Sequence, residues 1–203
     1  MRATMQGNPK ILREWRNMAE IIARHLIYDG WYRFSRLEMR MPDGTVSERH
    51  LIDNGQAVAV LPYDRERRLA MLITQPRAAV LDAGHPPLLE AIAGGLDGAA
   101  PEERIIEEAM EEGGVRLGDL EPVSNIWPMP PVSTERVMLY LAPYTAADRV
   151  GPGGGAEGED EHIHVVEIGL DALRDMVMDG SLQDAKTLIL AQTLILRHPG
   201  LWA

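Results

Sequence analysis

Residues Gly94 to Val115, GGLDGAAPEERIIEEAMEEGGV, decide the fold of this 203-residue chain. They predict a glycine-rich loop, one helix that carries six glutamates, and a double-glycine stop. Pro101 suits the first helical position, because its φ is already helical and its missing N–H is not needed there. Gly113 and Gly114 can supply the left-handed conformation that ends a helix. The sequence therefore predicts a helix that begins at Pro101 and ends at the two glycines.

This helix has an apolar arc and an acidic arc, because successive residues are rotated by about 100° around a helix axis. The arc that we expect to face the core holds Ile105, Ile106, Ala109 and Met110. The opposite arc holds Arg104, Glu107, Glu108, Glu111 and Glu112. Carboxylates three or four residues apart repel one another by about 0.2–0.5 kcal/mol per pair, whereas Mg²⁺ or Mn²⁺ would be bound by them. The acidic arc indicates either a metal site or a solvated helix face.

The same stretch resembles the Nudix box, G-x5-E-x7-R-E-U-x-E-E-x-G-U, in which U is an aliphatic residue. The tail of the box is matched by Glu108, Ala109, Glu111, Glu112, Gly114 and Val115. Two positions differ, since Glu107 replaces the family arginine and Ala99 or Ala100 replaces the loop glutamate. The loop that opens at Gly94 is also one residue shorter than the pattern. The resemblance implies a metal site on the helix.

Composition limits the other possibilities. The chain has 20 Lys and Arg against 31 Asp and Glu, and its net charge of −11 repels nucleic acid. An acidic protein that acts on a diphosphate needs a metal ion and a few arginines. The absence of cysteine excludes disulfides and thiolate catalysis. Because no apolar run reaches the length of a membrane span, we expect a soluble, cytoplasmic protein that binds neither nucleic acid nor membranes.

Residues 1–53 predict an N-terminal extension around a small antiparallel unit. A helix is expected from residue 11, followed by strands near 21–28, 31–41 and 45–53. The turn Pro42-Asp43-Gly44 joins the last two strands as a hairpin. Trp31 either packs in this unit, with Tyr32 and Phe34, or stacks on a nucleobase.

Two apolar runs, Gln56 to Pro62 and Leu69 to Thr74, predict central strands joined by a charged turn. The Gln75-Pro76-Arg77 segment that follows is similar to the Q-x-R of Nudix enzymes that act on ADP-ribose and nucleotide sugars. That resemblance implies that Arg77 reaches the substrate phosphates, while a surface arginine at a strand end is the other interpretation. Residues Leu88 to Gly94 resemble L-x-E-x-x-A-G of the same enzymes, which implies that the Ala93 carbonyl binds metal.

Strands are also predicted at Leu120–Pro128, Arg136–Ala142 and His162–Ile168, followed by helices at Asp171–Met178 and Leu182–Arg197. The loop before the second of these strands resembles P-S-P-G-x-x-x-E, which implies that Glu135 contacts substrate. Met129 and Pro131 replace the serine and the glycine of that pattern.

A glycine-rich acidic loop, GGGAEGEDE, occupies residues 153–161. It resembles G-G-G-x-E-x-E-D of the GDP-mannose pyrophosphatase branch of the family. In related enzymes the first glutamate positions or deprotonates the attacking water, so the resemblance implies this role for Glu157, with Glu159 as a second candidate. An acidic linker that solvates a hairpin is the other interpretation. Lys186, in a D-A-K-T segment similar to the branch's D-G-K-T, is expected in a packing or dimer contact.

The motifs occur in family order, from about residue 20 to 198, and imply an α/β fold. This is a Nudix-type α/β/α sandwich with a mixed sheet in residues 54–203, plus the N-terminal antiparallel unit as a homodimer contact. The implied activity is metal-dependent hydrolysis of the diphosphate of a nucleoside diphosphate sugar or ADP-ribose. The implied metal ligands for Mg²⁺ or Mn²⁺ are Ala93, Glu108, Glu111 and Glu112.

The resemblance also implies which residues act on the substrate. The implied catalytic residues are Glu157, Glu111 and Glu159, and the implied substrate contacts are Arg77, Glu135 and Trp31. The alternative is a Nudix module that has lost turnover and binds a nucleotide or nucleotide sugar as a sensor or regulator. The changes at Glu107 and at Ala99 or Ala100 favour that alternative, while the intact box glutamates oppose it.

Overall fold

The computed structural model describes residues 18–155, 158 and 162–202. The helix expected from residue 11, Glu157 and Glu159 lie outside the described residues. The chain divides into two compact units. The first runs to Asn54 and includes Met129–Thr134, and the second comprises Gly55–Pro128 and the residues from Glu135 onward.

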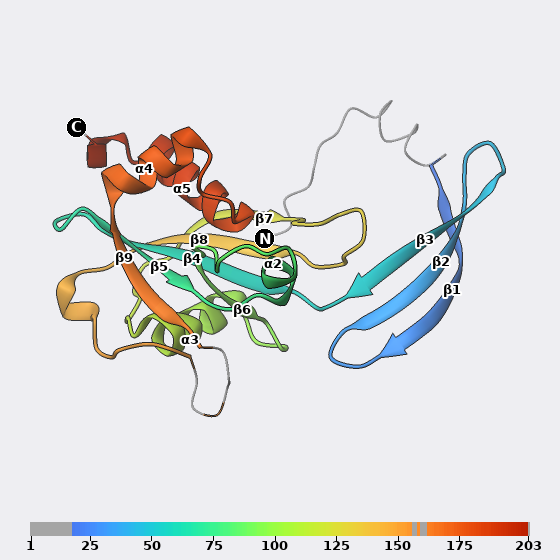
Figure 1. Ribbon diagram of the computed structural model, residues 1–203, viewed down its shortest axis with the longest axis horizontal. Helices are drawn as coiled ribbons and strands as arrows, with labels where there is room; N and C mark the ends of the chain where they lie inside the picture. Colours follow the sequence, from blue (N-terminus) through green and yellow to red (C-terminus); the bar gives the residue numbers. More distant parts are fainter. Residues whose placement is uncertain (1–17, 156–157, 159–161, 203) are drawn as a thin grey trace. The chain divides into compact units, whose positions relative to one another are not determined.

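The first unit is a three-stranded antiparallel sheet in the order β1-β2-β3 (Figure 1). Its strands are β1 (Glu20–Asp29), β2 (Arg33–Arg40) and β3 (Val46–Asp53). The predicted turn before β3 is stabilised by Asp43, whose carboxylate accepts hydrogen bonds from the backbone N–H and hydroxyl of Thr45 at 2.9 and 2.6 Å. The three predicted strands of this unit are confirmed.

Large apolar side chains of this sheet remain exposed. They include Ile21, Leu26, Ile27, Tyr28, Trp31, Tyr32 and Val46. Trp31 is 92% exposed, so the expectation that it packs within the antiparallel unit is wrong. Phe34 stacks on His50 with ring centroids 5.4 Å apart, as a packing residue should. Trp31 precedes β2 in a bend, where no neighbouring strand covers its ring.

The second unit contains a six-stranded mixed sheet in the order β7-β8-β4-β5-β9, with β6 paired to β4. The strands are β4 (Ala57–Asp64), β5 (Leu69–Thr74), β6 (Ile92–Gly95), β7 (Glu121–Ile126), β8 (Val137–Pro143) and β9 (His164–Gly169). β4 is parallel to β8 and antiparallel to β5 and β6, which confirms the mixed sheet. Both faces of β4 are covered, so it is apolar along nearly its whole length.

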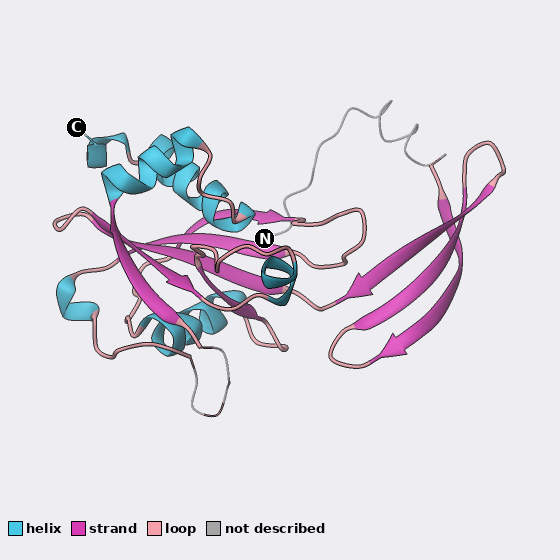
Figure 2. Cartoon of the chain, in the orientation of Figure 1, coloured by secondary structure: helices cyan, strands magenta, loops and turns pink. Residues whose placement is uncertain are grey.

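Helices cover both faces of this sheet (Figures 1 and 2). On one face, α3 (Pro101–Gly113) packs Ile105 and Ala109 against Val58 and Val60 of β4. On the other, α4 (Leu170–Asp179) and α5 (Ala185–Arg197) pack against Leu61 and its neighbours. Successive residues of β4 serve opposite faces, as the strand period requires. The predicted α/β/α sandwich is confirmed.

Some boundaries differ from the prediction. β4 continues to Asp64 instead of ending at Pro62, because Tyr63 and Asp64 pair with the start of β5. The carboxylate of Asp64 then accepts the backbone N–H groups of Glu66 and Arg67, which closes the turn. The short helices α2 (Ala78–Asp82), η1 (Ala146–Asp148) and η2 (Pro199–Trp202) were not predicted. In the described part of the chain, no helix has the length and apolar character needed to cross a membrane.

Candidate active site

Helix α3 has the ends that its sequence predicts. Pro101 is its first residue, and Gly114 caps it in the left-handed conformation with φ of 61°. Glu102 and Glu103 lie in the first turn, where the positive end of the helix dipole favours carboxylates. The helix therefore starts and stops on local signals alone.

The buried face of α3 agrees only in part with the one that the helical pattern predicted. Ile106 and Met110 are 38% and 37% exposed, whereas Glu108 and Glu112 are only 5% and 2% exposed. The expectation that Ile106 and Met110 face the core is therefore wrong, whereas Ile105 and Ala109 are fully buried as expected. The physical reason is that both buried carboxylates are compensated, since Glu112 accepts the Ala93 N–H of β6 and Glu108 pairs with Arg104.

Glu112 binds the backbone of β6, since its Oε2 accepts the N–H of Ala93 at 3.0 Å. Glu108 lies over the next residue, Gly94, where any side chain would collide with the carboxylate. In an extended strand the N–H and C=O of one residue point the same way, so the carbonyl of Ala93 also faces away from β4. Two buried carboxylates and one backbone carbonyl thus meet along the free edge of β6.

This donor set fits a hard divalent cation. Mg²⁺ is commonly held by one or two carboxylates together with substrate phosphates, and the glycine at residue 94 leaves room for the Glu108 carboxylate. Glu111 is more peripheral, since its side chain is 38% exposed and its Oε2 lies 3.5 Å from Arg104. Consistently, no three Asp, Glu, His or Cys side chains form a metal-binding group in the described residues.

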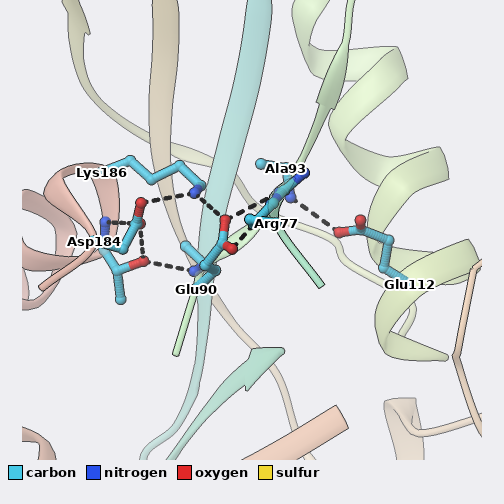
Figure 3. A network of polar contacts seen from close by, with 8 residues as sticks. Arg77, Glu90, Ala93, Glu112, Asp184 and Lys186 are labelled. Carbon is cyan, nitrogen blue, oxygen red and sulfur yellow. Dashed lines mark hydrogen bonds and ion pairs between the residues drawn. The ribbon is translucent and has the colours of Figure 1, made fainter. Parts of the chain in front are cut away.

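Arg77 lies beside the same strand (Figure 3). Its Nε and Nη2 donate to the two carboxylate oxygens of Glu90, each at 3.0 Å. The Glu90 side chain is 4% exposed, and the Arg77 side chain 42% exposed. The bond pair is the strong, planar kind that arginine forms with carboxylates. Arg77 is therefore fixed in orientation and still open to solvent.

Lys186 completes a polar row from α5 to α3. Its Nζ donates to Glu90 at 2.6 Å and to Asp184 at 2.9 Å, and its side chain is 15% exposed. Asp184 caps α5 by accepting the N–H of Thr187, and the Thr187 hydroxyl accepts the N–H of Ala91. In Figure 3, Arg77, Glu90 and Ala93 lie between Lys186 of α5 and Glu112 of α3. Lys186 thus makes its contacts within the chain, and such an intramolecular contact was one of the two roles expected for it.

The charge on Glu90 is stabilised by its two cations. Burial by itself would raise the pKa of this carboxyl, but the hydrogen bonds and charges of Arg77 and Lys186 outweigh burial and hold the pKa below its usual value. Glu90 carries these contacts although the sequence analysis assigned it no role. A charged residue inside the apolar run LLEAIAGG was the signal.

The glycines at the start of the acidic loop, Gly153 to Gly155, contact the end of α3. Gly154 and Gly155 donate their N–H groups to the carbonyls of Glu112 and Glu111 at 2.9 and 3.0 Å. Gly153 has φ of 70°, and a side chain there would collide with the Glu112 carbonyl. The chain that leads toward residue 157 therefore starts at the carboxyl end of the helix that carries the box glutamates.

The other candidate residues belong to other segments of the chain. Glu135 is partly buried just before β8 in the second unit, and Trp31 belongs to the first unit. Glu157 and Glu159 lie outside the described residues. The structure therefore brings together Arg77, Ala93, Glu108 and Glu112, adds Glu90 and Lys186, and leaves Glu111 at the rim.

The sheet, its helical layers and the acidic helix at the edge of β6 are those of a Nudix-type hydrolase. A curated GDP-mannose pyrophosphatase of Enterobacter sp. (strain 638) is 36% identical over 181 residues, which cover 86% of this chain and 94% of the relative. The GDP-mannose pyrophosphatase of Cronobacter sakazakii is also 36% identical, over 88% of this chain and 95% of its own. The chain belongs to the GDP-mannose pyrophosphatase family of Nudix proteins.

The fold has a solved counterpart. A crystal structure described as an ADP compounds hydrolase superposes with a TM-score of 0.69, covering 89% of this chain and 96% of that one. Its sequence identity of 15% shows a shared fold and no more. No protein-family model matches the chain.

Proposed function

We propose that the protein is a metal-dependent hydrolase that cleaves the diphosphate linkage of a nucleoside diphosphate sugar or of ADP-ribose. The products are a nucleoside monophosphate and a sugar phosphate. One observation carries the proposal. Glu108 and Glu112 are buried at the edge of β6. Glu90, just before this strand, forms ion pairs with Arg77 and Lys186. Carboxylates for a cation and an arginine for an anion thus flank one strand. The names of the curated relatives make GDP-mannose the first substrate to test.

The cation site is proposed at the junction of α3 and β6. Its ligands, for Mg²⁺ or Mn²⁺, are Ala93 through its carbonyl, Glu108, Glu111 and Glu112. A divalent cation bound there supplies charge neutralisation for the phosphates and polarises water. The carboxylates and the carbonyl of this chain would hold the cation in place, and Glu108 and Glu112 are buried.

Arg77 is proposed to bind a phosphate oxygen. Glu90 engages its Nε and Nη2, and within the described residues its Nη1 makes no hydrogen bond. The guanidinium therefore has a donor left for a charge-assisted bond to the substrate. Glu135 and Trp31 are proposed as further substrate contacts, Trp31 by stacking its exposed ring on a base.

Water is the proposed nucleophile. Glu157, with Glu159 as the second candidate and Glu111 as a further carboxylate near the cation, is proposed to orient it or accept its proton. Support for Glu157 comes from its sequence motif and from the glycines that anchor the preceding residues on α3.

A binding module without turnover is the second candidate, favoured by Glu107 and by the alanines at 99 and 100. One experiment separates the two. The purified protein is incubated with GDP-mannose, other nucleoside diphosphate sugars, ADP-ribose and dinucleotides, with Mg²⁺ or Mn²⁺. Phosphate released after addition of a phosphatase reports hydrolysis. Turnover that requires the metal supports the hydrolase, while ligand-induced thermal stabilisation without turnover selects the binding module.

A further inference from the structure

Arg104 contacts three carboxylates and one backbone carbonyl. Its Nη2 pairs with Oε1 of Glu108, and its Nη1 lies 3.3 Å from Glu107 and 3.5 Å from Glu111. Its Nε donates to the carbonyl of Gly95 at 3.2 Å. The three glutamates lie three, four and seven residues further along α3, so they lie on the same side of the helix as Arg104. One guanidinium therefore joins three carboxylates of α3 to the end of β6.

The surroundings make these contacts stronger than ordinary surface pairs. The Arg104 side chain is 23% exposed and that of Glu108 is 7% exposed, so water screens their attraction only in part. Glu108 also lies three and four residues before Glu111 and Glu112, whose charges repel it. Without a positive charge nearby, this repulsion would favour side-chain rotamers that move the three carboxylates away from one another.

The bond to Gly95 sets the direction of the guanidinium. β6 contributes Ala93 and Gly94 to the candidate site, and Arg104 is tied to the same strand one residue further on. Arginine can serve a carbonyl and two carboxylates together because its donors form a rigid planar fork, which lysine lacks. Through Arg104, the orientation of Glu108 is therefore set by β6 as well as by α3.

We propose that Arg104 is a positioning residue that holds Glu108 and Glu111 in place for the divalent cation of the active site. This inference rests on the proposed function. Arg104 acts through the carboxylates and does not contact substrate. It supplies, from one turn earlier in the helix, the positive charge that the acidic residue Glu107 cannot supply.

The test measures Mn²⁺ affinity without substrate, by the electron paramagnetic resonance signal of the free ion. Arg104→Ala is compared with Arg104→Lys, which keeps the charge but loses the fork. Arg174→Ala is the matched control, because Arg174 is a helix arginine paired with Asp171 and Asp175 at 3.3 and 3.6 Å, away from the site. Circular dichroism melting verifies that each variant is folded.

We expect Arg104→Ala to weaken Mn²⁺ binding about tenfold, as the loss of a group that orients a metal ligand does. Arg104→Lys should lie between Arg104→Ala and wild type, and Arg174→Ala should stay within about twofold of wild type. Equal or tighter Mn²⁺ binding by folded Arg104→Ala would overturn the positioning role, and tighter binding would show that the guanidinium competes with the cation. Wild-type protein that binds no Mn²⁺ would instead refute the proposed metal site, and the positioning role with it.

Discussion

Replacing Glu90 by glutamine should destabilise the protein by removing the charge that joins Arg77 to Lys186. Glu90 is 4% exposed at its side chain and makes two bonds of 3.0 Å to Arg77 and one of 2.6 Å to Lys186. A hydrogen bond to a charged group contributes about 1.5–3 kcal/mol, and breaking a fully buried pair costs about 3–5 kcal/mol. The value here should be lower, because Arg77 is 42% exposed and Lys186 keeps Asp184.

We therefore expect Glu90→Gln to lower the free energy of unfolding by about 2 kcal/mol. For a chain of this length that corresponds to a fall in Tm of about 4–8 °C. Asp171→Asn is the control, since Asp171 also pairs with two arginines, Arg68 and Arg174, but its side chain is 58% exposed. An exposed pair contributes under about 1 kcal/mol. Urea unfolding and calorimetric melting at pH 7 measure both variants.

The pH dependence gives a second readout with a defined sign. The pKa of Glu90 is lowered in the folded protein, chiefly because Arg77 and Lys186 outweigh the effect of burial. Its contribution is therefore complete above the unfolded pKa of about 4.3 and is lost as the pH falls through the lower folded value. The difference in unfolding free energy between wild type and Glu90→Gln should be constant from pH 6 to 7.5 and shrink below about pH 4. A Glu90→Gln Tm within 2 °C of wild type at pH 7 would refute the reasoning.

Four further predictions follow from single contacts. Glu112→Gln should lose most of its turnover and melt at or above wild type without metal, because the amide oxygen can still accept the Ala93 N–H; half of wild-type activity would contradict the metal site. Gly153→Ala should melt lower than Gly180→Ala, because both have positive φ but only residue 153 faces the Glu112 carbonyl within the described chain; equal melting would remove that contact from the argument. Glu107→Arg should raise Mn²⁺ affinity or turnover by less than about fivefold, since an exposed pair is weak; a decrease in both would count against it. Light scattering should find a homodimer, because the small sheet exposes residues such as Leu26, Tyr28 and Trp31; a monomer at all concentrations would refute it.

Much of the fold is encoded in local signals that sequence can show. Leu69–Thr74 was predicted as a strand and is β5 without adjustment, because an apolar run of this length between Arg68 and Gln75-Pro76 is too short for most helices. Pro101 and Gly114 fix the ends of α3, because the proline ring holds φ at a helical value and glycine, which lacks a side chain, adopts the left-handed conformation. The prediction of a mixed sheet within an α/β/α sandwich, by contrast, came from the family resemblance, and the order of its strands was not predicted. Periodicity alone gives no strand order.

The candidate site was less accessible to prediction, because its contacts are long-range. Glu90 contacts Arg77 across 13 residues and Lys186 across 96. Spacing rules cover only neighbours on one helix or strand, so they could connect Arg104 with Glu108 but not Glu90 with either cation. Helix α2 was missed for a related reason, since its five residues are not buried and give no apolar pattern.

The residues that α3 buries depart from its hydrophobic pattern where carboxylates make polar contacts. By hydrophobicity, Ile106 and Met110 should be inside and Glu108 outside, yet the order is reversed for all three. Burial of a carboxylate is costly unless it is bonded or paired, and Glu108 meets this condition through Arg104, while Glu112 meets it through the Ala93 N–H. In α3, Ile106 and Met110 are therefore partly exposed, while the charged side chains of Glu108 and Glu112 are buried beside β6.

That arrangement has a chemical consequence for the site as a whole. β6 fixes Glu112 through Ala93, and the adjoining residues Glu90 and Ala91 fix Arg77 and the start of α5. The proposed cation ligands Ala93 and Glu112 and the proposed phosphate-binding residue Arg77 are therefore positioned by one short stretch of backbone. A diphosphate needs both at once, because its charge must be neutralised on either side of the bond that breaks. A stretch of backbone that positions both proposed groups would preorganise the site for this linkage.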